Sequence, residues 1–96
     1  MPIRSFGDTA TENFFHAGRT KKGAGWASLK AIVKRKLDMV NYAAKLEDLK
    51  SPPGNRLEAL VGDLKGFHSI RINDQWRVVF RWSDSGPLDV RVCDYH

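Results

Sequence analysis

Four arginines in the second half of the chain carry the first chemical signal. Each lies on the polar side of a segment in which apolar and polar residues alternate with a period of two, as in a half-buried β-strand. Three successive segments contribute them, so we expect one side of a sheet to carry Arg71, Arg77, Arg81 and Arg91. A guanidinium presents donors in a rigid fork that suits phosphate, and this pattern indicates anion binding. The alternative for each arginine is a solvated side chain paired with a nearby aspartate.

The last three residues could supply acid–base groups. Asp94, Tyr95 and His96 directly follow the last apolar strand segment and offer a carboxylate, a phenol and an imidazole. The alternative is a frayed chain end. A second imidazole, His68, shares a strand face with Ile70 and is predicted to lie near the arginines. There it either shares the acid–base work or is a partly buried structural residue.

Metal and cofactor chemistry have no support in the spacing of the residues. Three scattered His and one Cys form no familiar metal-ligand pattern. The glycine-rich run at 18–25 matches neither phosphate-loop motif, and it reads as a surface loop or a phosphate contact. Cys93 reads as a packing residue, and a single Cys excludes an internal disulfide. We therefore expect no cofactor and no metal.

The charge of the chain is unevenly distributed. Residues 1–56 carry 11 basic and 5 acidic side chains, whereas residues 57–96 carry 5 basic and 6 acidic ones. A basic half favours a polyanionic partner such as RNA, and the alternative is a solvated surface. Lys34, Arg35 and Lys36 form a basic rim on the solvated face of a predicted helix, and Lys34 and Arg35 are candidate RNA contacts.

The elements that must position these residues follow from apolar spacing. Capping residues, Asp8 or Thr9 at the start and Gly18 at the end, predict a helix over 9–17. A second helix is predicted over 26–46, with an apolar stripe at Trp26, Leu29, Val33, Leu37, Val40 and Ala44. Two prolines and Gly-Asn at 52–55 force a turn. Strands are predicted over 57–61, 67–73, 76–82 and 88–93, with a possible edge strand over 2–6.

These elements predict a single α+β domain over residues 1–96. Short turns between the last strands require a mostly antiparallel sheet of about four to five strands, and two N-terminal helices would pack on one face of it. The other face, with the arginines, stays open. No segment is long and apolar enough for a membrane span or resembles a signal peptide, so the expected location is cytoplasmic.

Three motifs together resemble HigB-type toxins, the plasmid maintenance killer family within the RelE superfamily. They are the run SPPGNRLEAL at 51–60, the run HSIRINDQWRVVF at 68–80, and the terminal DYH. The resemblance covers nearly the whole chain. It implies the same small sheet with two helices on one side.

The resemblance also implies an activity and its partners. Such toxins are metal-independent endoribonucleases that cut mRNA in the A site of the translating ribosome. A HigA-type helix-turn-helix antitoxin neutralises them, and operator DNA is bound only through that complex. The alternative is a non-catalytic RNA-binding protein, or a degenerate toxin that binds only its antitoxin.

Site residues follow from the resemblance position by position. Arg77 matches the strand arginine that faces the scissile phosphate, and Asp94, Tyr95 and His96 match the C-terminal functional cluster. The stretch LEALVG at 57–62 departs from the LHPLKG-like family pattern, so Glu58 and Val61 replace a His and a Lys. Which of Asp94, His96 or His68 is base or acid therefore stays open.

Overall fold

The computed structural model of the chain describes residues 1–20 and 24–94. Its regular elements are the helices α1 (Thr9–Ala17) and α2 (Lys30–Tyr42) and the strands β1 (Glu58–Ala59), β2 (Phe67–Arg71), β3 (Trp76–Ser83) and β4 (Gly86–Asp94). Short 3-10 helices lie at 27–29, 46–50, 53–55 and 62–64.

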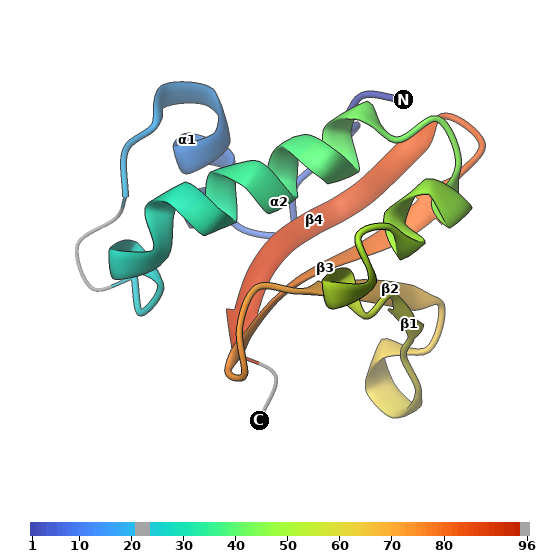
Figure 1. Cartoon of the computed structure of the whole chain (residues 1–96). Helices are drawn as coiled ribbons and strands as arrows, with labels where there is room; N and C mark the ends of the chain where they lie inside the picture. The colour runs from blue at the N-terminus through green and yellow to red at the C-terminus, as the bar shows by residue number, and fades with distance from the viewer. Residues whose placement is uncertain (21–23, 95–96) are drawn as a thin grey trace.

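The four strands form one antiparallel sheet in the order β1-β2-β3-β4. The short β2–β3 and β3–β4 connections leave no room for a crossover, so neighbours in sequence pair as hairpins. Figure 1 shows α1 and α2 on one side, with α2 running in front of β4. The predicted α+β architecture, with two helices on one face of the sheet, is confirmed.

The N-terminal segment covers the outer edge of β4. The amides of Arg4 and Gly7 donate to carbonyls of β4, and the amide of Val90 donates to the carbonyl of Ser5 (2.8–3.1 Å). An unpaired strand edge would invite aggregation, and these bonds close it. The predicted edge strand over 2–6 is thus a hydrogen-bonded edge segment that makes one parallel bridge, Phe6 to Val90.

The core lies between the helices and the sheet. Val33, Leu37 and Val40 of α2 are fully buried against Ile70, Val78, Phe80 and Val90 of the strands. This is the stripe that the helical spacing predicted. The α1 helix begins at Asp8, whose carboxylate accepts from the amide of Thr11 (2.8 Å), and it ends at Gly18 in the left-handed region.

Several predicted boundaries are wrong. The second helix stops at Tyr42, because Ala43 is extended, and a separate 3-10 helix follows at 46–50. Ala43 rather than Ala44 is therefore buried. The strand predicted over 57–61 is only two residues long, Glu58–Ala59. Lys36, assigned to a solvated basic rim, is buried and donates to Asn55 Oδ1. Burial lowers its pKa, and nearby Arg35 and Arg71 add to the effect.

Candidate functional site

The strand register confirms that four arginines share the face of the sheet opposite the helices. Arg71 pairs directly with Arg77, Val79 pairs with Arg91, and Phe67 pairs with Arg81. Paired residues point to the same side of a sheet. We call this side the arginine face and define it by Arg71, Arg77, Arg81 and Arg91.

Arg77 is the most enclosed of the three arginines on this face that form ion pairs. Its side chain is only 14% exposed, against 32% for Arg71 and 54% for Arg81. Nη1 donates to Ser69 Oγ at 2.8 Å and to the carbonyl of Arg56 at 3.4 Å, and it lies 3.1 Å from Glu58 Oε1. Several acceptors on three segments thus fix this guanidinium in place.

The other arginines of the arginine face differ in their partners. Arg71 pairs with Asp74, and Arg81 lies 3.8 Å from Asp89 and 5.7 Å above the ring of Phe67. Within the described part of the chain, Arg91 has no ion pair, and its Nε is buried without a hydrogen-bond partner. The aspartate pairing expected as the alternative is therefore found for two of the four.

Asp94 ends β4 at the same end of the sheet as Arg77. It pairs with Trp76, so its side chain belongs to the helix side of the sheet rather than to the arginine face, and its carboxylate accepts from Gln75 Nε2 at 2.9 Å. Across from Arg77 itself lies Cys93, whose thiol pKa is raised chiefly by burial. A thiol held protonated is a poor nucleophile, which agrees with the packing role predicted for it. Tyr95 and His96, predicted to act beside Asp94, lie outside the described residues.

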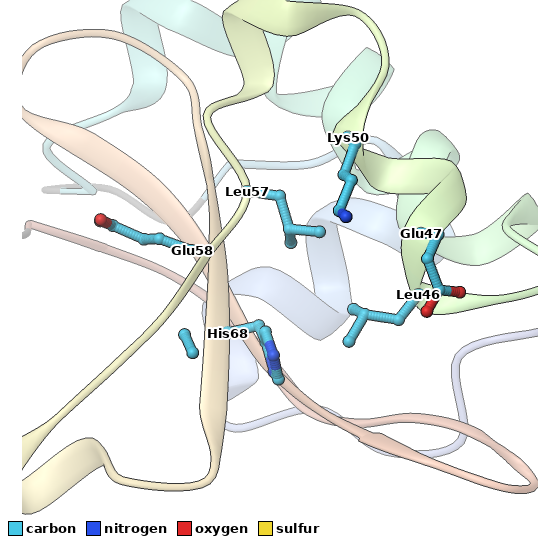
Figure 2. Close-up of a pocket in the computed structure, with 7 residues that line it drawn as sticks. Leu46, Glu47, Lys50, Leu57, Glu58 and His68 are labelled. Carbon is cyan, nitrogen blue, oxygen red and sulfur yellow. The ribbon is translucent and has the colours of Figure 1, made fainter.

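His68 lies on the other side of the sheet from the arginines. It pairs with Phe80 of the core, and the two rings stack with centroids 6.3 Å apart. Its ring borders a hollow of about 290 Å³ between β1, β2 and the 3-10 helix 46–50. Figure 2 shows Leu46, Lys50 and Leu57 around this hollow, and Glu58, which also lines it, extends its carboxylate away from Leu57 and Lys50. The expectation that His68 lies near the arginines is therefore wrong, because strand alternation separates them.

Lys34 and Arg35 also lie away from the arginine face. Both belong to α2, which packs on the opposite side of the sheet. Lys34 is bound to Asp38 one turn later at 2.7 Å, and Arg35 is exposed. They form a second basic surface rather than part of the same one.

Two residues near Arg77 were not predicted as partners. Ser69 is fully buried on the arginine face, and its register opposite Val79 places it beside Arg77. Alternation with His68 and Ile70 already assigned it to that face, so the signal was present. Glu58 reaches Arg77 through the pairing of β1 with β2, which no local pattern reveals.

No described helix is long and apolar enough to cross a membrane. Within residues 1–20 and 24–94, no group of three His, Cys, Asp or Glu side chains is arranged to hold a metal ion.

Comparison with solved structures supports the fold. A YoeB/ParE toxin from Agrobacterium tumefaciens superposes with a TM-score of 0.52 at 23% identity, covering 100% of this chain and 99% of that one. A YoeB-YefM complex from Staphylococcus aureus contains a chain that superposes with a TM-score of 0.55 at 18% identity, with the same coverage. At these identities the likeness concerns the fold.

Sequence comparison gives the family. Toxin HigB-1 of Vibrio cholerae is 44% identical over 63 residues, which span 66% of each chain. An uncharacterized protein of Haemophilus influenzae is 32% identical over 80 residues, or 83% of this chain and 78% of that one. A family model described as the RelE-like toxin HigB of type II toxin-antitoxin systems matches residues 4–96. The chain therefore belongs to the HigB-like toxin family.

Proposed function

We propose that this toxin is a metal-independent endoribonuclease that cleaves mRNA in the A site of the translating ribosome, and hence acts in the cytoplasm. One observation carries the proposal. The enclosed guanidinium of Arg77 lies at the end of the sheet where β4 brings Asp94, and Tyr95 and His96 follow Asp94 in the chain. A phosphate-binding group thus lies at the end of the sheet from which the chain runs on into residues with acid–base side chains, although the register of Asp94 with Trp76 assigns its own side chain to the helix side.

The proposed reaction is an intramolecular transesterification of RNA. A base removes the proton of a ribose 2′-hydroxyl, and the oxygen attacks the adjacent phosphorus. The bond to the 5′-oxygen breaks, and an acid protonates that leaving oxygen. Arg77 stabilises the extra negative charge on the phosphorane, with help from Arg71. Asp94 and His96 share the proton transfers, and Tyr95 stacks on a base or donates to the substrate.

The carboxylate of Glu58 is a further candidate for the base. It stands where related toxins carry a His, and it already lies 3.1 Å from the guanidinium that would bind the phosphate. His68 is disfavoured as the base, because its ring lies on the helix side of the sheet.

The ribosome would orient the substrate, a task that a deep pocket performs in other enzymes. Two hollows of the described surface measure about 240 and 290 Å³, below the range of about 300–1,000 Å³ typical of ligand pockets. A substrate held by ribosomal RNA arrives already oriented, which removes much of the entropy cost of positioning. Lys34 and Arg35 of α2, together with Arg81, would contact RNA phosphates, and Arg91 would contact the RNA beside them.

A HigA-type helix-turn-helix antitoxin is the proposed protein partner. Membership of the HigB-like family supports it, and the solved Staphylococcus aureus neighbour is a YoeB-YefM complex. The toxin would reach operator DNA only through its complex with the antitoxin.

The test is translation of a defined mRNA with purified ribosomes, with cuts mapped by primer extension. Wild-type protein should cut only when ribosomes translate. Arg77→Ala should lower the cleavage rate by about 10²–10³-fold, and His96→Ala by about 10²–10⁴-fold, the usual range for charge-stabilising and acid–base groups. Both variants should still co-sediment with ribosomes.

A degenerate toxin is the second candidate. Val61 stands where related toxins carry a Lys, and its side chain is 84% exposed, so that cation is absent from the surface. Ribosome binding by a folded wild-type protein that leaves the mRNA intact would refute the nuclease proposal. Restoring cleavage with Val61→Lys would then identify the lost group.

A further inference from the structure

A second hollow lies on the arginine face, beyond Arg77 along the strands. It measures about 240 Å³ and is lined by Gly7, Phe67, Asp89 and Arg91. The N-terminal segment, β2 and β4 each contribute to it. We call it the bulge hollow, because β4 carries one extra residue here. Between the pairs Val79–Arg91 and Arg81–Leu88, β3 advances two positions while β4 advances three.

The lining combines a ring, a donor and an acceptor. Arg81 holds its guanidinium 5.7 Å from the ring of Phe67 and 3.8 Å from the carboxylate of Asp89. The Nε of Arg91 is a buried donor with no partner among the described residues. Buried donors are nearly always satisfied, so the unpartnered Nε leaves Arg91, a residue that lines the hollow, with a donor in need of an acceptor.

The backbone around the bulge hollow is fixed. Asp89 has a positive φ of 54°, a conformation that few residues with side chains adopt. Its amide donates to Ser5 Oγ at 2.9 Å, which holds the bulge. A Cβ at Gly7 would lie 2.8 Å from the carbonyl oxygen of Asp89 and 3.1 Å from Cδ of Arg91, so glycine is what lets the segment close this wall.

We propose that the bulge hollow binds the base of a nucleotide next to the scissile phosphate and prefers guanine; this rests on the proposed nuclease function. Guanine offers donors that an acceptor-only carboxylate can receive, and it offers acceptors for an arginine. Asp89 and Arg91 supply one of each. Phe67, with the guanidinium of Arg81 over its ring, provides a planar group for stacking, as in single-strand RNA recognition.

The position suits a neighbouring nucleotide. Arg91 pairs with Val79, which is two residues along β3 from Arg77. Phe67, on the far side of the hollow, pairs with Arg81, which is four residues from Arg77. At about 3.4 Å per strand residue the hollow thus lies about 7–14 Å from Arg77, a distance that one to two nucleotides can bridge. RNA lying along the strands would then put its scissile phosphate on Arg77 and the next base in the bulge hollow.

Binding can be tested without ribosomes or cleavage. Nitrogen-15-labelled protein is titrated with guanosine, adenosine, cytidine and uridine 5′-monophosphates, and with ribose 5-phosphate as the base-free control. GMP should shift the resonances of the Gly7 and Asp89 amides and of the Arg91 Nε–H, and should bind about tenfold more tightly than CMP or UMP. Ribose 5-phosphate should leave the Arg91 Nε–H in place.

Two variants sharpen the test. Asp89→Asn keeps a residue type that tolerates positive φ, and it should reduce the preference for GMP over AMP by about tenfold. Phe67→Leu should weaken all four nucleotides. Lys45→Gln, a loss of one exposed positive charge on the helix side, should change neither.

Equal shifts from ribose 5-phosphate and GMP would overturn the proposal, because they would identify a simple anion site. Absence of shifts at the bulge hollow would also overturn it. Neither result would touch the nuclease function, which the ribosome assay tests separately.

Discussion

A guanidinium stabilises a transition state best when its position is fixed before the substrate binds. Arg77 meets this requirement through Ser69, whose hydroxyl is fully buried and accepts from Nη1 at 2.8 Å. A group already oriented toward developing charge avoids reorganisation during the reaction. Ser69 is thus a positioning residue, since it acts on the substrate only through Arg77.

Replacing Ser69 by Ala should loosen the position of the Arg77 guanidinium without removing its charge. We expect kcat for ribosome-dependent cleavage to fall by about tenfold with KM nearly unchanged, because the phosphorane loses a fixed partner while ground-state binding keeps its charge. Loss of one hydrogen bond should cost about 0.5–1.5 kcal/mol of unfolding free energy. Cleavage kinetics and thermal unfolding measure the two effects.

Ser28→Ala is the matched control, because Ser28 is exposed near the start of α2. It should leave both quantities unchanged. A Ser69→Ala protein with normal kcat would show that Glu58 and the Arg56 carbonyl suffice to hold Arg77.

At the scale of elements, one asparagine joins the proline-rich turn to the rest of the fold. Asn55 is fully buried and accepts from the ammonium of Lys36 on α2. Its Nδ2 donates to the carbonyls of Leu49 and Ser51 at 3.2 and 3.3 Å. The residue therefore satisfies two carbonyls near the end of the 3-10 helix 46–50 and the buried cation at once.

Asn55→Ala should destabilise the protein by about 2–4 kcal/mol, since it leaves a buried ammonium and two carbonyls without partners. For a domain of this size the melting temperature should fall by about 10–25 °C. Asn13→Ala, an exposed change on α1, should shift it by only a few degrees. A loss below about 1 kcal/mol for Asn55→Ala would mean that water replaces the amide.

The contact between Lys36 and Asn55 also shows how much of the fold the sequence predicts. Capping residues predicted α1, and the spacing of apolar residues predicted the buried stripe of α2 and the arginine face. Each of these depends only on residues close together in the sequence. Burial of Lys36 was missed, although it lies three residues after Val33 on the same side of the helix. Its partner comes from a turn 19 residues later, and such tertiary pairing leaves no local pattern. The contact of Glu58 with Arg77 escaped prediction for the same reason.

At the scale of the whole molecule, positive charge lies on two opposite surfaces. The arginine face occupies one side of the sheet, and Lys34 and Arg35 lie on α2 on the other. A strand of mRNA bound along the arginine face would contact α2 only by passing around the edge of the sheet. Two surfaces therefore suit a protein that grips substrate on one side and a large RNA scaffold on the other.

The double variant Lys34→Gln, Arg35→Gln separates these roles. It should weaken co-sedimentation with ribosomes. The slope of log affinity against log salt concentration should become shallower by about one to two, because binding releases fewer counterions when phosphate contacts are lost. Nucleotide binding at the arginine face should stay unchanged. Stability should change by less than about 0.5 kcal/mol, since the Lys34–Asp38 pair is exposed.

A second double variant with the same loss of charge controls for net charge. Lys45→Gln, Lys65→Gln removes two exposed positive charges elsewhere and should leave the salt slope intact. If both double variants weaken ribosome binding equally, attraction depends on total charge and α2 is no docking surface. If Lys34→Gln, Arg35→Gln instead weakens nucleotide binding, the two surfaces are not independent, and RNA must wrap around the edge of the sheet.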